Sequence, residues 1–307
     1  MRKVIIDADT GIDDALALLL AVRSEKLDIV GVTTVCGNVS LDQATANTKK
    51  VLKLLGKDKD IPVIRGASRP LMREPLFETS VHGSCGLGGA LENMEADPAD
   101  EGFAPDFIIE QAQKHKGELA LILMTPLTNM ALALRKEPRL AEWVQELIIM
   151  GGVVSAHGNM SPVAEYNIYV DPEAARIVFH SGIPITLVGL DVTRKALLHE
   201  GHIEQLLGNE VGDFVQTCTR HYIDRYSQVN GIRACALHDP LAVGVAIDKS
   251  IVQTRKLFVD VETRSELCDG QTVCDFQNRL KRTPNIDVCL QVDSDRFLDM
   301  FVGALKQ

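Results

Sequence analysis

The sequence of 307 residues predicts an α/β fold with a mostly parallel central sheet flanked by helices. Strand-like and helix-like stretches alternate along the chain, as they do in βα units around a parallel sheet. A hydrophobic fraction of 46% is ample for a large core, and polar residues follow several of the predicted strands. No break in composition and no internal repeat divides the chain, so we expect one domain over residues 1–307.

The expected elements follow one another from the start of the chain. The strand-like runs are KVIIDA, DIVGVTTV, IPVI, ELALILM, QELIIM and PITLVGL. The helix-like runs between them include residues 13–23, LDQATANTKKVLKLL and LTNMALALRK. The longest irregular stretch, residues 66–103, carries HGSCGLGG, and we expect it to form a mobile flap over a site.

Composition and charge argue against several classes of protein. The net charge of −10 disfavours a nucleic-acid partner, because phosphate backbones require a basic surface. The longest apolar runs, such as ALALLLAV, are too short to span a bilayer, and MRKVIID does not resemble a signal peptide. Seven cysteines, mostly in apolar settings, indicate reduced thiols. We therefore expect a cytoplasmic protein that binds neither membranes nor nucleic acid.

Polar residues and glycines converge on one edge of the predicted sheet. The carboxyl ends of parallel strands meet at the same edge, and ligands bind there. The residues at or just after these ends are Asp7, Asp9, Asn38, Met124, Thr125, Met150, Gly151, Gly152 and Asp191. The sequence therefore predicts a binding site at this edge.

The stretch DADTGIDDALAL holds four aspartates within eight positions, between the first strand and the first helix. Crowded carboxylates repel one another unless a cation or a proton lies among them. Helix capping explains one or two of them, and Asp13 or Thr10 suits that role, but it does not explain all four. A hard cation held by oxygen ligands accounts better for Asp7, Asp9, Asp13 and Asp14.

Other motifs match less well. A haloacid-dehalogenase-type phosphatase needs Thr or Val four residues after its first aspartate, but Gly11 stands there. An EF-hand loop fails because Gly11 and Ile12 occupy its fifth and sixth positions. CGLGGA lacks the GxGxxG spacing, and HEGH at residues 199–202 is not HExxH, so we expect a solvated helix face there.

The motifs and their order resemble the inosine–uridine nucleoside hydrolases. The signature of that family, DxDxGxDD after a first strand, matches DADTGIDD. Further matches over nearly the whole chain are CGN, HG at residues 82–83, PLTNMALAL, IIMGG, GNMSPVAEYNIYVDPEAA and HDPLAV. The resemblance implies a nucleoside-hydrolase-like α/β domain, a small-molecule ribonucleoside as substrate, and a homodimer or homotetramer.

The resemblance also implies a bound calcium ion, Ca2+. In the family it is held by two aspartates of the first motif, one main-chain carbonyl and the aspartate of a later HD pair. These ligands correspond to Asp9, Asp14, the Met124 carbonyl and Asp239. The family usually has TGPLTN at the carbonyl, whereas this chain has MTPLTN. Calcium takes about six to eight oxygen ligands, so water and two ribose hydroxyls complete the set.

The implied reaction is hydrolysis of the N-glycosidic bond to ribose and a free base, through an oxocarbenium-like transition state. Calcium lowers the pKa of water, and Asp9 is the expected base. His238 is the expected acid for the leaving group, since imidazole titrates near the working pH. The expected substrate contacts are Asp13 at a ribose hydroxyl, Asn38 at water or a hydroxyl, Met150 near the sugar, and Asn159, Glu165 and Asn167 in the ribose clamp.

Five further residues are interpreted with a structural role in view. For three of them it is one of two interpretations, and for the other two it is the main one. His82, on the predicted flap, either contacts the base or supports the loop. Tyr166 and Tyr226 either stack on the base or pack in the core. Asp7 is expected to orient the acidic loop, and Asp191 is expected to support the site without a catalytic role.

Base preference is where the sequence is least informative. Pyrimidine-preferring members place a Gln and a Tyr on the helix before the HD pair, where this chain has Tyr226 and Asn230. We therefore expect broad specificity that includes inosine and uridine. The alternatives are a pyrimidine-preferring hydrolase and a non-catalytic nucleoside or pentose binder on the same fold. The complete set of acidic residues and the HD histidine argue against the binder.

Overall fold

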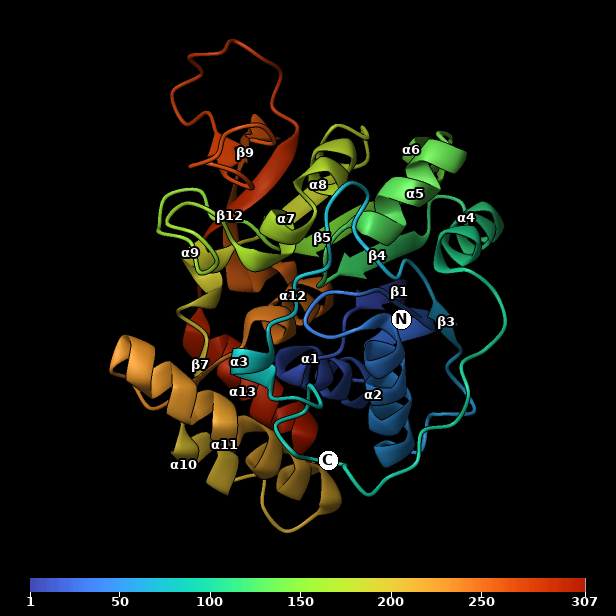
Figure 1. Cartoon of the computed structure of the whole chain (residues 1–307), viewed down its shortest axis with the longest axis vertical. Helices are drawn as coiled ribbons and strands as arrows, with labels where there is room; N and C mark the ends of the chain where they lie inside the picture. Colours follow the sequence, from blue (N-terminus) through green and yellow to red (C-terminus); the bar gives the residue numbers. More distant parts are fainter. Residues whose placement is uncertain (307) are drawn as a thin grey trace.

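Eight strands form the central sheet of the computed structural model, which describes residues 1–306 (Figure 1). Their order is β3-β2-β1-β4-β5-β6-β12-β9, and all neighbours are parallel except β12 and β9. The strands are β1 (Arg2–Ala8), β2 (Leu27–Thr34), β3 (Val63–Arg65), β4 (Leu119–Leu123), β5 (Glu146–Met150), β6 (Ile185–Val188), β9 (Val252–Leu257) and β12 (Ile286–Val292). Two small pairs are β7 (Leu197–Leu198) with β8 (Cys235–Ala236), and β10 (Val259–Val261) with β11 (Thr272–Cys274). The mostly parallel sheet confirms the predicted fold class.

Helices cover both faces of the sheet, and each face has its own hydrophobic core (Figure 1). One core takes side chains from α1 (Ile12–Arg23), α2 (Leu41–Leu54), α11 (Glu210–Asn230), α12 (His238–Ile247) and α13 (Ser294–Leu305). The other takes side chains from α4 (Ala104–Lys114), α5 (Thr128–Lys136), α6 (Leu140–Trp143) and α8 (Pro172–Phe179). The connections contain the short helices α3 (Thr79–His82), α7 (Tyr166–Val170), α9 (Leu190–Thr193) and α10 (Glu200–Glu204) and the 3₁₀ turn Lys249–Ile251.

The predicted strands and helices are present with small shifts at their ends. The helix expected at residues 13–23 begins one residue earlier, at Ile12. β9 and β12 have no counterpart among the predicted elements. β9 lies at the edge of the sheet and buries only Val252 and Leu257, so its sequence VQTRKL has no alternating strand pattern. All seven cysteines are free thiols.

Helix α1 is buried over most of its length. Every residue from Ile12 to Ala21 is buried, and the helix packs against α12, α13 and α2. A helix that is apolar on all sides belongs inside a protein. This explains why the apolar run ALALLLA follows the acidic motif directly. The burial of α1 also holds its first turn beside the carboxyl end of β1.

The strand order changes direction between β1 and β4. β1 leads through α1 to β2 on one side, whereas β4 and the later strands lie on the other side. Such a switch point leaves a crevice at the carboxyl ends of the two strands. Asp9 follows β1 and Met124 follows β4, and the Met124 amide donates to the Asp7 carbonyl at 3.0 Å. The fold therefore joins two segments that are distant in the sequence.

Residues 66–103, the predicted flap, are fastened at both ends in this structure and contain one short helix, α3. Near the start, Arg73 forms a bidentate pair with Glu173 of α8. Near the end, Lys49 of α2 pairs with Asp100 at 2.7 Å. Movement of the segment between these anchors stays a prediction.

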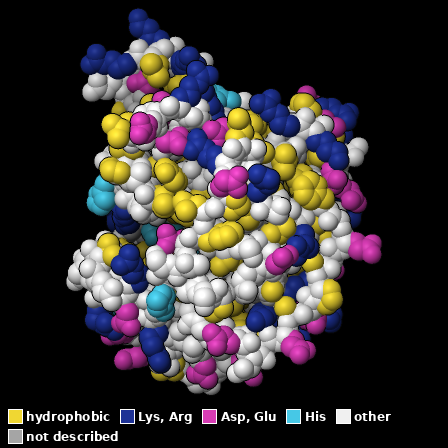
Figure 2. All heavy atoms as spheres, in the orientation of Figure 1, with side chains coloured by type: hydrophobic (Ala, Val, Ile, Leu, Met, Phe, Trp, Pro, Cys, Tyr) yellow, Lys and Arg dark blue, Asp and Glu magenta, His cyan; other side chains and the backbone are white. Residues whose placement is uncertain are grey.

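Charged side chains of both signs are mixed over the visible face of the protein (Figure 2). The loop that projects between β11 and β12 is more basic, since Arg279, Lys281 and Arg282 are all exposed there (Figures 1 and 2). Within residues 1–306, no helix is both long enough and apolar enough to cross a membrane.

Leu19 in the middle of α1 is fully buried and tests the packing of this helix. Leu19→Ala removes buried methyl groups and leaves a cavity, so we expect the free energy of unfolding to fall by about 2–5 kcal/mol. Leu267 is 83% exposed, and Leu267→Ala should change the free energy of unfolding by less than about 0.5 kcal/mol. Urea denaturation measures both variants, and equal losses would contradict the central role of α1.

Candidate active site

A cavity of about 330 Å³ opens at the carboxyl ends of β1, β4 and β5. Its volume lies in the range of small-molecule sites. The predicted site residues that line it are Asp13, Asn38, His82, Met124, Met150, Asn159, Glu165, Asn167, Tyr226, His238 and Asp239. Asp9 and Asp14 do not line it and are fully buried next to Asn38. The structure therefore brings the predicted residues of seven separate motifs to one place.

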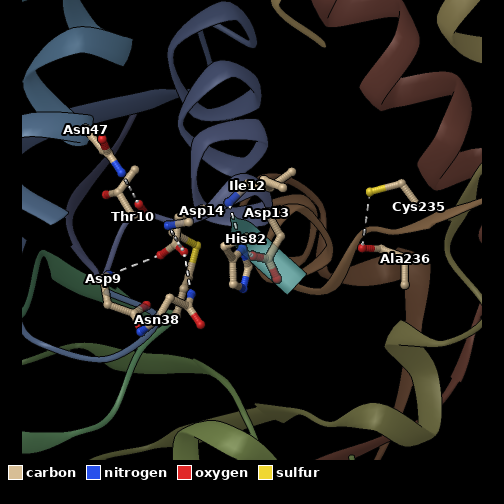
Figure 3. Close-up of polar contacts among 12 residues, drawn as sticks. Asp9, Thr10, Ile12, Asp13, Asp14, Asn38, Asn47, His82, Cys235 and Ala236 are labelled. Atoms are coloured by element: carbon tan, nitrogen blue, oxygen red, sulfur yellow. Dashed lines mark hydrogen bonds and ion pairs between the residues drawn. The ribbon is translucent and has the colours of Figure 1, made fainter. Parts of the chain in front are cut away.

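Asp14 lies in the first turn of α1, and three N–H donors hold its carboxylate (Figure 3). Its carboxylate accepts from the Asp9 amide at 3.2 Å and from the Gly11 amide at 2.9 Å. Asn38 Nδ2 donates to the same carboxylate at 3.1 Å. Free amides at a helix N-terminus favour negative charge. Asn38 thus orients a carboxylate, and its predicted contact with water or a hydroxyl stays a prediction.

Asp9 is anchored through only one of its carboxylate oxygens. Oδ2 accepts from the Asn38 amide at 2.5 Å, whereas Oδ1 is buried without a hydrogen-bond partner among residues 1–306. Gly37 permits this close approach, because a Cβ at that position would overlap Asp9 Oδ2. A buried carboxylate oxygen without a partner is costly unless a cation or a proton meets it.

Three carboxylates lie close enough together to hold one metal ion. Ligand oxygens of Asp13, Asp14 and Asp239 lie within 4.8 Å of one another, and all three residues are buried. Burial raises the pKa of Asp13 to about 6 and the pKa of Asp14 to about 7. Burial and then repulsion from the neighbouring carboxylates raise the pKa of Asp239. A divalent cation removes this penalty, and an oxygen-only donor set fits calcium.

The three grouped carboxylates differ by one residue from the three carboxylate ligands predicted for calcium. Asp9, a predicted ligand, lies outside the group of three carboxylates, whereas Asp13, a predicted ribose contact, lies within it. Asp13 Oδ1 is also buried without a hydrogen-bond partner in the described part of the chain. Both Asp9 and Asp13 therefore have an oxygen available for a cation or for a substrate hydroxyl.

The Met124 carbonyl, the fourth predicted ligand, already accepts one hydrogen bond. Asn167 Nδ2 donates to it at 3.2 Å and also to the Met150 carbonyl at 3.3 Å. A carbonyl oxygen has two lone pairs, so one remains for a cation. Thr125 replaces the glycine of the family pattern, and it is not among the residues with positive φ. The turn after β4 therefore does not require glycine.

The predicted ribose clamp lies on the loop before α7 and at its start. Glu165 accepts from the amides of Gly152 at 2.8 Å and Asn167 at 3.0 Å, and burial raises its pKa to about 7. Asn159 Oδ1 accepts from the Tyr166 amide at 3.0 Å. Backbone amides thus hold both Glu165 and Asn159 where they line the cavity.

His82 reaches the acidic motif from α3 (Figure 3). Its Nδ1 accepts from the Ile12 amide at 3.0 Å and lies 3.9 Å from Asp13 Oδ1. Burial lowers the pKa of His82 to about 4, so the ring is uncharged at neutral pH and carries its proton on Nε2. A Cβ at residue 11 would lie 2.5 Å from His82 Nδ1, which explains Gly11. His82 therefore has a structural role, and its contact with a base stays a prediction.

His238 is the first residue of α12 and lines the cavity next to Asp239. Its Nδ1 lies 2.7 Å from Thr193 Oγ1 of α9. Burial, and then the positive charge of Arg194, lower the pKa of His238 to about 3. The ring is therefore uncharged at neutral pH.

Several lining residues were not singled out by the sequence analysis. They are Glu78, Ser80, Val81, His157, Arg194, Tyr222, Arg225 and Val229. Arg194 donates to the His157 carbonyl at 2.6 Å and so braces the loop before α7. Tyr222 and Tyr226 pack edge to face, with ring centroids 6.0 Å apart. Their spacing of four residues on α11 is a signal that could have identified Tyr222, since Tyr226 was already a candidate.

Asp7 and Asp191, which were expected to support the site, brace its surroundings. Asp7 accepts from side chains on β2 and α5 and does not line the cavity. Asp191 accepts from three consecutive amides of residues 154–156 and so holds the loop that leads to the ribose clamp. Tyr166, expected either to stack on the base or to pack in the core, lines the cavity and is mostly buried, and its hydroxyl donates to the Leu76 carbonyl of the predicted flap at 2.5 Å.

Known proteins match this chain over nearly its whole length. Residues 4–299 match the family model described as inosine-uridine preferring nucleoside hydrolase. The pyrimidine-specific ribonucleoside hydrolase RihA of Salmonella schwarzengrund is 37% identical over 99% of this chain and 98% of that protein. The plant nucleoside hydrolase PpNRh1 has a TM-score of 0.95 at 33% identity, and the match covers 99% of both chains. The purine-preferring ribonucleoside hydrolase from Gardnerella vaginalis has a TM-score of 0.94 at 33% identity, over 99% of this chain and 98% of that one.

The matched residues 4–299 of this chain include its acidic motif and the residues that line its cavity. The chain belongs to the inosine-uridine preferring nucleoside hydrolase family.

Proposed function

We propose that this protein uses calcium to hydrolyse the N-glycosidic bond of ribonucleosides, giving ribose and a free base. The observation that carries the proposal is the cluster of buried carboxylates beside a cavity in the size range of small-molecule sites. Carboxylates accept hydrogen bonds from ribose hydroxyls and stabilise the positive charge that develops on the sugar. Membership of the nucleoside hydrolase family supports the same reaction.

Each proposed role follows from a position in the site. Asp9 has a free buried oxygen and is the base that takes a proton from the attacking water. Asp13 binds a ribose hydroxyl, and Glu165 and Asn167 contact the sugar. The nucleobase leaves with the electron pair of the C1′–N bond. His238 faces the nucleobase and donates a hydrogen bond to this leaving group. The remaining proposed substrate contacts are Asn38, His82, Met150, Asn159 and Tyr226.

The proposed calcium ligands are Asp9, Asp14, Asp239 and the Met124 carbonyl. The unpartnered oxygen of Asp9 and the close grouping of Asp14 with Asp239 support this set. When bound, calcium lowers the pKa of water and attracts oxygens of the ribose. Asp13 belongs to the same group of carboxylates and is the alternative ligand.

We propose broad base specificity that includes inosine and uridine. Two relatives differ in this property, since one is named pyrimidine-specific and the other purine-preferring. α11 presents Tyr222, Tyr226 and Asn230 to the cavity, and aromatic faces accept either kind of base. Pyrimidine preference is the second candidate, because RihA is 37% identical to this chain. A cytoplasmic location, supported by seven free thiols, and a homodimer or homotetramer belong to the same proposal.

Release of reducing sugar tests the proposed function. We expect the purified protein to release ribose from inosine and uridine, to lose this activity after prolonged chelation and to regain it with calcium. Protein passed through the same steps without chelator is the control. Binding of inosine without release of ribose would favour the non-catalytic binder. Full activity in protein shown by elemental analysis to be metal-free would refute the calcium assignment.

Asp9→Ala removes the proposed base and a proposed calcium ligand together. We expect kcat for inosine to fall by about 10³-fold or more. Asp28 is an exposed aspartate of β2, and Asp28→Ala should leave kcat unchanged. Calorimetric titration should show weaker calcium binding in the Asp9 variant alone. Wild-type turnover in Asp9→Ala would rule out both roles.

Discrimination against 2′-deoxynucleosides tests the ribose contacts. A site whose carboxylates accept from ribose hydroxyls leaves these oxygens unpaired when a hydroxyl is missing. We expect kcat/KM for 2′-deoxyuridine to be about 10³-fold or more below that for uridine. Uridine 5′-monophosphate should also be a poor substrate, since its phosphate meets an acidic site. Similar kcat/KM values for uridine and 2′-deoxyuridine would contradict the proposed contacts.

A further inference from the structure

Thr193 ends α9 with a hydroxyl group that is fully buried and does not line the cavity. Oγ1 lies 2.7 Å from Nδ1 of His238, and this is the hydroxyl's only hydrogen bond in the described part of the chain. The ring of His238 therefore faces the protein with its Nδ1 side, and its other edge is left for the cavity. The direction of this hydrogen bond decides which ring nitrogen carries the proton.

Other threonines on helices of this protein donate their hydroxyl proton to the carbonyl four residues earlier. They are Thr45, Thr48, Thr217 and Thr219. Thr193 makes no such bond within residues 1–306, so its proton has one acceptor at hand, His238 Nδ1. If Nδ1 carried the proton instead, the buried hydroxyl would accept from it and its own proton would have no partner. Buried donors are rarely left unpaired, so the hydroxyl donates.

An imidazole nitrogen that accepts a hydrogen bond carries no proton, so a His238 ring whose Nδ1 accepts from Thr193 has its N–H on Nε2. His82 shows the same arrangement without ambiguity, because its Nδ1 accepts from the Ile12 backbone amide. Two of the three histidines that line the cavity, His82 and His238, are therefore held through Nδ1 by donors that belong to the protein.

We propose that Thr193 is a positioning residue that donates to Nδ1 of His238 and so holds the ring with its N–H on Nε2, directed at the leaving base. The inference rests on the proposed function. When the C1′–N bond breaks, its electron pair passes to the base nitrogen, and Nε2–H donates a hydrogen bond to that nitrogen. Water supplies the hydroxyl to C1′ and gives its proton to Asp9; Asp9 then returns a proton to solvent, and the departed base takes one from solvent. Thr193 touches neither the substrate nor the reacting atoms and acts through the ring.

The test compares Thr193→Val, which has nearly the same shape without a hydroxyl, with Thr193→Ser, which keeps the hydroxyl. Nitrogen-15 spectra of histidine-labelled protein report the tautomer of each ring. In the wild type we expect the Nε2–H form at both His82 and His238. In Thr193→Val the His238 signals should move away from that form while those of His82 stay unchanged, and Thr193→Ser should resemble the wild type.

Kinetics give an independent readout. Inosine needs help for its leaving base, whereas p-nitrophenyl riboside does not, because p-nitrophenolate leaves without a proton. We expect Thr193→Val to lower kcat for inosine by about 10-fold or more. The kcat for p-nitrophenyl riboside should change by less than about twofold, and Thr193→Ser should restore the wild-type ratio of the two substrates.

An unchanged His238 tautomer in Thr193→Val, or equal losses on both substrates, would overturn the proposal. If Val disturbs α9, shown by a shift of the melting temperature, Thr193→Ala provides the same comparison. His238→Ala tests the leaving-group role of His238 separately from the role of Thr193. Equal losses on both substrates in His238→Ala would refute the leaving-group role of His238, whereas the tautomer in Thr193→Val still tests Thr193. A wild type without nucleoside hydrolysis would refute the proposed function alone.

Discussion

Several carboxylates share a space of a few ångströms at the head of α1, and much of the surrounding structure serves to hold them there. Burial and mutual repulsion raise the pKa of Asp9, Asp14 and Asp239, so an isolated cluster of this kind would take up protons or come apart. The turn between β1 and α1 opposes this with backbone N–H groups. Asn38 adds one donor to Asp9 and another to Asp14. The oxygens that stay unpaired after these bonds are those that a cation or a ribose hydroxyl can take.

The topology of the sheet determines where this cluster lies. The strand order reverses between β1 and β4, so the segments after these strands meet across a crevice. α1 supplies the amides at its first turn and is anchored by its own burial among other helices. α12 begins at the same crevice and brings His238 and Asp239 to it. Gly11 and Gly37 permit the close contacts that a Cβ would block.

Two segments outside the sheet complete the site from different directions. The flap segment brings His82 onto the first turn of α1, and α9 brings Thr193 to the ring of His238. α9 and the residue that follows it also brace the loop before α7, because Asp191 accepts from amides of that loop and Arg194 donates to its carbonyls. One short segment therefore holds both a histidine of the cavity and the loop that carries the ribose clamp.

The sequence by itself determined the fold class, the acidic motif and the edge of the sheet on which the site lies. These features depend on short-range patterns, namely the alternation of apolar strands and helices and the spacing of Asp9, Asp13 and Asp14 around one turn. Only the tertiary structure decided which carboxylates lie within reach of one ion, why Gly11 is glycine, and that Thr193 holds His238. It also placed the edge strand β9, whose exposed middle carries no strand pattern. The physical reason is that these contacts join segments far apart in the chain, and packing of the whole domain, rather than local spacing, sets their distances.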